Sequence, residues 1–91
     1  MISVKFEREQ KDGLLFSAVY VAGDRLEFHN DIAWKLLERG REYDIHWRTL
    51  GPTGSSLVIS KTAGGAADKI VNSVIRDEDQ GRVSDFTLFT V

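Results

Sequence analysis

The chain has 91 residues, no cysteine, and a net charge of -2 that comes from 12 basic and 14 acidic residues scattered along it. This length allows one domain with one hydrophobic core, and the lack of cysteine excludes disulfides, thiolate catalysis and thiolate metal sites. Because the basic residues form no cluster that could follow a phosphate backbone, the composition argues against nucleic acid as a partner.

The first part of the chain consists of short segments of β character separated by turns that contain glycine. Residues 2–7 alternate apolar and polar side chains, which is typical of a half-buried strand. Residues 14–21 are apolar on both faces, as in the interior of a sheet. After a turn at 22–24, residues 25–29 predict a third, short strand.

Residues 31–39 fit two structures. Their apolar spacing suits a helix that is capped at its start by Asn30 or Asp31 and ended by Gly40. It also suits a strand in which large apolar residues, among them Trp34, alternate along the chain. We favour the strand.

Residues 42–49 are the clearest strand in the sequence. Pro52 and Gly54 then supply the backbone angles of a tight turn, and residues 56–60 form the next strand. This order predicts a hairpin between the two strands.

Residues 66–77 again fit a helix or a strand, and four β-branched residues favour a strand over 69–76. A polar turn at 77–81 follows, and residues 85–91 form the last strand. Seven or eight short strands at this spacing predict an all-β fold, a small antiparallel β-sandwich of the Greek-key or immunoglobulin-like kind. The alternative is an α+β domain with helices near 31–39 and 66–77.

The segment LERGREY, residues 37–43, resembles the corner of fibronectin type III and related immunoglobulin-like sandwiches. The resemblance implies that the Tyr43 hydroxyl forms a hydrogen bond back across the turn. In those modules the corner lies late in the domain, whereas here 48 residues follow Tyr43.

One face of the strand at 42–49 carries the side chains that could do chemistry: Glu42, Asp44, His46 and Arg48. Alternate residues on a strand can converge on one ion, so Asp44 and His46 are candidate metal ligands, with His29 as the other imidazole. The same pair could serve a small hydrolase, although no serine lies in a nucleophile motif. We favour the simpler interpretation, a solvated strand face whose alternating charges pair with neighbours across the sheet.

Exposed aromatic rings are the second kind of candidate. Trp34 would be exposed if its strand lies at the edge of a sheet. Phe86 and Leu88 point to one face of the last strand and Phe89 and Val91 to the other, so this strand is either central or covered by a second subunit. Phe89 is thus the second candidate binding residue and suggests a homo-oligomer.

From these features we expect a non-enzymatic binding or protein-interaction module without a cofactor and without catalytic residues. The alternatives are a metal-binding protein or hydrolase using Asp44 and His46, and a sugar- or lipid-recognition domain using exposed aromatics. The N-terminal residues have no continuous apolar stretch, and the apolar run at 14–22 is too short to span a bilayer. We therefore expect a cytoplasmic protein with no transmembrane segment.

Overall fold

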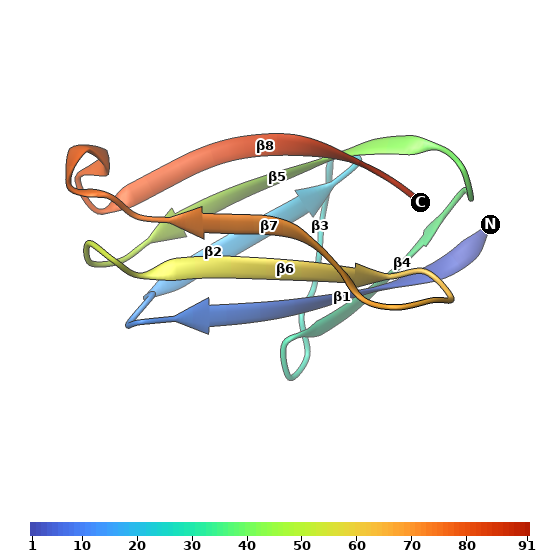
Figure 1. Ribbon diagram of the computed structural model, residues 1–91, viewed down its shortest axis with the longest axis horizontal. Helices are drawn as coiled ribbons and strands as arrows, with labels where there is room; N and C mark the ends of the chain where they lie inside the picture. The colour runs from blue at the N-terminus through green and yellow to red at the C-terminus, as the bar shows by residue number, and fades with distance from the viewer.

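In a computed structural model of residues 1–91, two four-stranded antiparallel sheets pack face to face (Figure 1). Sheet A has the strand order β4-β1-β6-β7, and sheet B has the order β3-β2-β5-β8. The strands are β1 (Ile2–Lys11), β2 (Phe16–Val21), β3 (Asp24–Arg25), β4 (Ile32–Leu37), β5 (Glu42–Leu50), β6 (Ser56–Thr62), β7 (Asp68–Val74) and β8 (Arg82–Thr90). The predicted antiparallel β-sandwich is confirmed.

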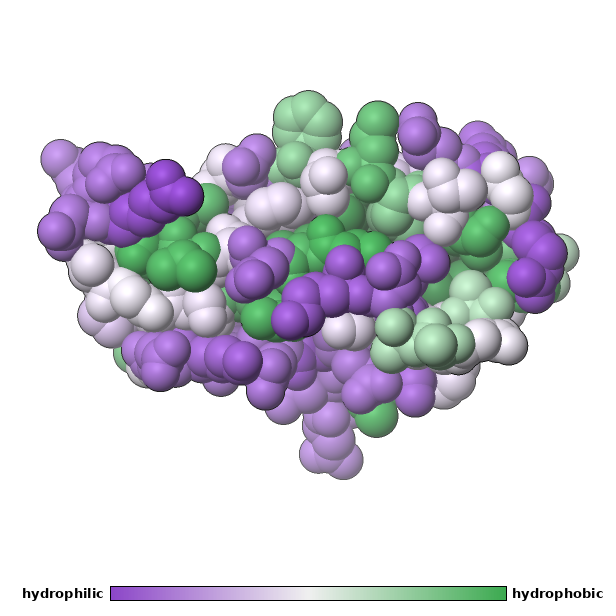
Figure 2. Space-filling model, in the orientation of Figure 1, coloured by the Kyte–Doolittle hydropathy of each residue, from purple (hydrophilic) through white to green (hydrophobic).

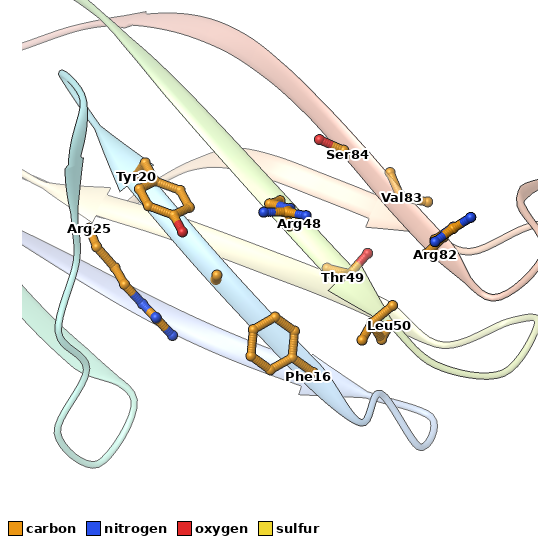
Figure 3. A pocket seen from close by; sticks show the side chains of 10 residues that line it. Phe16, Tyr20, Arg25, Arg48, Thr49, Leu50, Arg82, Val83 and Ser84 are labelled. Carbon is orange, nitrogen blue, oxygen red and sulfur yellow. The ribbon is translucent and has the colours of Figure 1, made fainter.

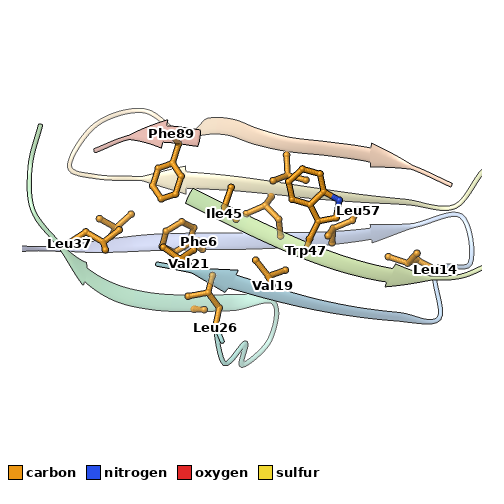
Figure 4. Close-up of a cluster of buried hydrophobic side chains, with 14 of the residues drawn as sticks. Phe6, Leu14, Val19, Val21, Leu26, Leu37, Ile45, Trp47, Leu57 and Phe89 are labelled. Atoms are coloured by element: carbon orange, nitrogen blue, oxygen red, sulfur yellow. The ribbon is translucent and has the colours of Figure 1, made fainter. Parts of the chain in front are cut away.

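The core lies between the sheets and is built mainly from inward-facing residues of the longer strands, whereas both residues of β3 are exposed. In β1 the fully buried side chains are Val4 and Phe6, and in β5 Ile45 and Trp47 point inward. Fifteen buried residues form one cluster, part of which Figure 4 shows. The alternation in the sequence therefore identified the inner faces of these two strands correctly.

Both segments that fitted either a helix or a strand are strands, so the α+β alternative is wrong. β4 pairs with β1, and β7 pairs with β6. In β4 the buried residues are Ala33 and Leu37. Residues four apart share a face in a helix and in a strand alike, which is why the pattern did not discriminate. Both segments form strands because β1 and β6 offer free edges, which supply hydrogen-bond partners for their backbones.

Two other expectations need correction. The strand predicted at 25–29 is only the two residues of β3, and the chain then leaves sheet B in an extended loop toward β4. The predicted hairpin after residue 50 does not form, because β5 belongs to sheet B and β6 to sheet A. The turn that contains Pro52 crosses between the sheets instead. Turn chemistry specifies a reversal of the chain but not which sheet the next strand joins.

The corner at 37–43 has the expected hydrogen bond, in which the Glu38 N–H donates to the Tyr43 hydroxyl at 2.8 Å. This corner links β4 to β5 and crosses from sheet A to sheet B. Immunoglobulin-like sandwiches place it between strands E and F, where E pairs with B and F pairs with C and G. Here β4 pairs with β1, and β5 pairs with β2 and β8.

The departure from those modules is also explained by the topology. In immunoglobulin-like chains, strand A precedes strand B and pairs with it. Here β6 lies beside β1, in the position that strand A has there. The strands that follow Tyr43 therefore complete both sheets. The pairings of β4 with β1 and of β5 with β2 and β8 thus follow those of E with B and of F with C and G, but no strand takes the place of D beside β4, and the order along the chain differs.

The polar turn predicted at 77–81 contains a single helical turn, η1 (Asp77–Asp79). The Arg76 N–H donates to Asp79 Oδ2 at 2.7 Å, and Gln80 ends the turn in the left-handed conformation, with φ 55°. No helix in the fold has the length and the apolar surface that crossing a bilayer requires.

Candidate functional site

The chemically rich face of β5 points outward from sheet B. Asp44 and Arg48 are exposed and His46 is half-buried, while Ile45 and Trp47 lie in the core. The sheet places β2 on one side of β5 and β8 on the other. On the outer face of sheet B, these side chains therefore lie beside those of β2 and β8.

The predicted metal site does not form. No three His, Asp or Glu side chains lie close enough together to hold a metal ion, so His29 does not join Asp44 and His46. His29 lies after β3 and forms a two-residue bridge with Ile32. The short β3 and the extended loop that follows it carry His29 away from the β5 face.

His46 has a different partner, which is Ser84 of β8. Its Nε2 lies 3.1 Å from the Ser84 hydroxyl, and its ring lies 6.0 Å from that of Tyr20. A serine beside an imidazole is the start of a nucleophile–base pair. No carboxylate forms a hydrogen bond with the ring to orient it, however, and both residues lie on an open sheet face. The arrangement is an incomplete catalytic constellation.

The two candidate aromatic residues have opposite outcomes. Trp34 lies on the edge strand β4 and is 63% exposed. Phe89 is only 6% exposed, so its proposed role as a surface binding residue is wrong. Its ring packs edge to face on Phe6 of the opposite sheet, with 5.9 Å between the ring centroids. β8 is an edge strand, and sheet A, not a second subunit, covers its inner face. The exposed ring of β8 is Phe86.

A groove of about 610 Å³ follows the outer face of sheet B. Its centre is the row Ala18–Arg48–Ser84 across β2, β5 and β8. The small side chains at both ends of this row leave the surface hollowed around the Arg48 guanidinium. The walls come from larger side chains on either side, as Figure 3 shows: Phe16, Tyr20, Arg25, Leu50 and Arg82. We call this the arginine groove.

The charges in the arginine groove are unusual for this protein. Seven salt bridges engage seven of the 12 basic side chains. Of the five that remain, three are Arg25, Arg48 and Arg82, and all three line the groove. Three cations around one hollow repel each other unless an anion lies between them.

The Asp24–Lys35 pair shows the contrasting situation, in which a cation has its own carboxylate. Lys35 Nζ donates to Asp24 Oδ2 at 2.8 Å and joins the edge strands of the two sheets. This hydrogen bond and the charge of Lys35 lower the pKa of the Asp24 carboxyl. Arg25, the next residue after Asp24, has no such partner and extends along the groove (Figure 3).

Sequence reasoning missed the arginine groove as a site. Arg48 stood out within its strand, but Arg25 and Arg82 lie far from it in the chain and carry no local motif. Only the order of strands in sheet B brings the three together. Comparison of the chain with known protein families, curated proteins and solved structures finds no match.

Proposed function

We propose that the protein is a non-enzymatic binding module that takes an anionic ligand in the arginine groove. The observation that carries this proposal is the set of three arginines without acidic partners around one hollow. Elsewhere the chain pairs most of its cations, so the absence of carboxylates here leaves a local positive surface on a protein whose net charge is -2.

The chemistry of the groove indicates the class of ligand. A guanidinium binds carboxylate and phosphate groups through two parallel hydrogen bonds. Phe16, Tyr20 and Leu50 add apolar surface beside the arginines, which favours an acidic group carried on an apolar or aromatic body. The volume of about 610 Å³ lies within the usual range for small-molecule sites, roughly 300–1,000 Å³.

Binding is preferred to hydrolysis at this face for a geometric reason. The His46–Ser84 pair lacks a third group to orient the imidazole, and a hydrolase also needs donors for a developing oxyanion. The arginines need neither feature to hold an anion. A neutral sugar is less well supported as the ligand, because it carries no negative charge to complement the three arginines.

The test is a titration of ¹⁵N-labelled protein with phenyl phosphate, benzoate and, as a cationic control, benzylamine. We expect the two anions to shift the amide signals of Ala18, Arg48 and Ser84, and benzylamine to leave them unchanged. Arg48→Gln should weaken anion binding by roughly tenfold, because it removes a charge-assisted hydrogen-bond donor. Whether phenyl phosphate or benzoate binds more tightly identifies the preferred acidic group.

Arg39→Gln is the matched control variant. Arg39 also has no salt bridge, but it lies outside the arginine groove, so its loss should leave anion binding unchanged. Equal weakening by both variants would mean that the anions respond only to total charge. That result, or no shift with either anion, would disprove the proposed function.

A further inference from the structure

β8 forms a free edge of sheet B, since it pairs only with β5. It spans nine residues, and Phe86 and Leu88 are exposed on its outer side. Figure 2 shows apolar side chains standing out along the upper margin of the molecule, where β8 runs in Figure 1. A long edge strand with exposed apolar side chains is a template for pairing with another strand.

The backbone groups at this edge can be identified. The Phe86 N–H donates to the carboxylate of Asp85 at 2.8 Å instead of to β5. In an antiparallel pair, alternate residues direct their N–H and C=O groups to the same side. The residues that present their backbone groups to the free edge are therefore Ser84, Phe86 and Leu88. The central donor among them, the Phe86 N–H, is bound by the Asp85 carboxylate.

Beneath this edge, a cleft of about 340 Å³ separates β8 from the end of β7. Trp47, which lies opposite Asp85 in the β5–β8 register, contributes to the wall of the cleft. Its side chain is only 6% exposed, yet its Nε1–H has no hydrogen-bond partner. Buried polar groups are normally paired, so this N–H is a donor for which a bound group could supply the acceptor.

The charge around the cleft indicates what kind of group would enter. Glu78, Asp79 and Asp85 line it together with one basic residue, Arg76, which lies 4.0 Å from Glu78 in a salt bridge. The cleft thus has an excess of carboxylates. A lysine or arginine side chain complements this charge, and a carbonyl oxygen complements the Trp47 donor.

From these observations we infer that the edge of β8 and the cleft beside it form a strand-addition site for an extended, basic segment of a partner protein. The segment pairs through its main chain with Ser84, Phe86 and Leu88, as in other β-augmented complexes. A lysine or arginine of the segment forms a salt bridge with the Asp85 carboxylate. The Phe86 N–H is then free to donate to the new strand. A carbonyl of the segment accepts from Trp47.

A second copy of the chain fits this edge less well. If β8 pairs with itself around a two-fold axis, inward-facing residues stay on the inner face of the enlarged sheet. In a pairing centred on Asp85 or Phe86, the two Asp85 side chains lie directly opposite or diagonal to each other, where like charges repel. A basic segment meets attraction at the same position.

The probe is a capped ten-residue peptide that alternates lysine with threonine or valine, and its control has glutamate in place of lysine. Binding is followed by ¹⁵N NMR, in which the two indole N–H signals serve as reporters. We expect the lysine peptide to shift the Trp47 indole signal and the Ser84, Phe86 and Leu88 amides. The indole of Trp34, on the distant edge strand β4, should not move. The glutamate peptide should bind at least tenfold more weakly.

Asp85→Asn should weaken binding of the lysine peptide by roughly tenfold, because it removes the charge-assisted bond. Asp44→Asn, which neutralises an exposed carboxylate on the outer face of β5, should have no effect. Arg48→Gln should leave peptide binding intact, which separates this site from the arginine groove. The inference is overturned if both peptides bind equally, if the Trp47 indole signal stays in place, or if sedimentation shows a dimer that the peptide does not disrupt.

Discussion

The hydroxyl of Tyr43 stabilises the corner through which the chain passes from sheet A to sheet B. It accepts a hydrogen bond from the Glu38 N–H at 2.8 Å, and the Arg41 guanidinium lies over the ring, 5.3 Å from its centroid. The same ring packs on Phe89 in the core, 6.1 Å between centroids. One side chain thus joins the turn, the strand and the core, which accounts for a tyrosine at this position.

Tyr43→Phe removes only the hydroxyl and keeps the ring contacts. We expect it to lower the free energy of unfolding by about 1 kcal/mol, the usual contribution of one such hydrogen bond. The measurement is urea denaturation followed by tryptophan fluorescence. Tyr20→Phe is the control, because the Tyr20 hydroxyl makes no hydrogen bond within the chain, and its unfolding midpoint should match that of the parent. Equal effects of the two substitutions would mean that the corner bond contributes nothing.

The connection between β5 and β6 depends on Gly51. This residue lies where the chain leaves sheet B and passes close to the start of β2. A Cβ added there would lie 2.6 Å from Ser55 Oγ and 3.2 Å from the Leu14 Cα. Ser55 cannot easily move away, because it is fully buried and its hydroxyl donates to the Pro52 carbonyl at 2.6 Å. The tight crossing therefore requires a residue without a side chain.

Gly51→Ala should destabilise the fold by about 1–3 kcal/mol, the usual cost of overpacking. Gly65→Ala is the matched control in the β6–β7 loop, since no atom lies within 4 Å of its added Cβ. It should change stability by about 0.5 kcal/mol or less. Thermal unfolding by circular dichroism distinguishes the two variants. A neutral Gly51→Ala would show that the crossing adapts to a side chain.

The two sheets are joined through large side chains that meet between them. Phe6 comes from β1 in sheet A and Phe89 from β8 in sheet B, and their rings pack edge to face. Such aromatic pairs contribute stability beyond the area that they bury. The last strand is thereby fixed to the opposite sheet near the end of the chain, even though β8 has a neighbour on only one side.

Phe89→Ala should lower the free energy of unfolding by about 3–5 kcal/mol, because it leaves a cavity between the sheets. Phe86→Ala is the control. Phe86 lies three residues away on the same strand but is 65% exposed, so its loss should lower the free energy of unfolding by about 0.5 kcal/mol or less. Urea denaturation measures both. If Phe86→Ala were the more damaging substitution, a second chain would have to cover the outer face of β8.

The sequence alone determined the class of fold and the faces of its most regular strands. Alternation along 2–7 and 42–49 is a local pattern, and a strand must follow it whatever its neighbours are. The tyrosine corner was expected from the resemblance of residues 37–43 to immunoglobulin-like corners, which is visible in the sequence because the two partners lie five residues apart. The outward direction of Asp44, His46 and Arg48 also follows from local alternation.

The neighbours of each strand could not be read from the sequence, because hydrogen bonds between strands join residues that are distant in the chain. The turn at Pro52 leads from sheet B to sheet A, and the loop after β3 places His29 away from the β5 face. Phe6 of the opposite sheet covers Phe89. The arginine groove has the same origin: Arg25, Arg48 and Arg82 belong to three strands, and they line one groove only because sheet B places β3, β2, β5 and β8 side by side.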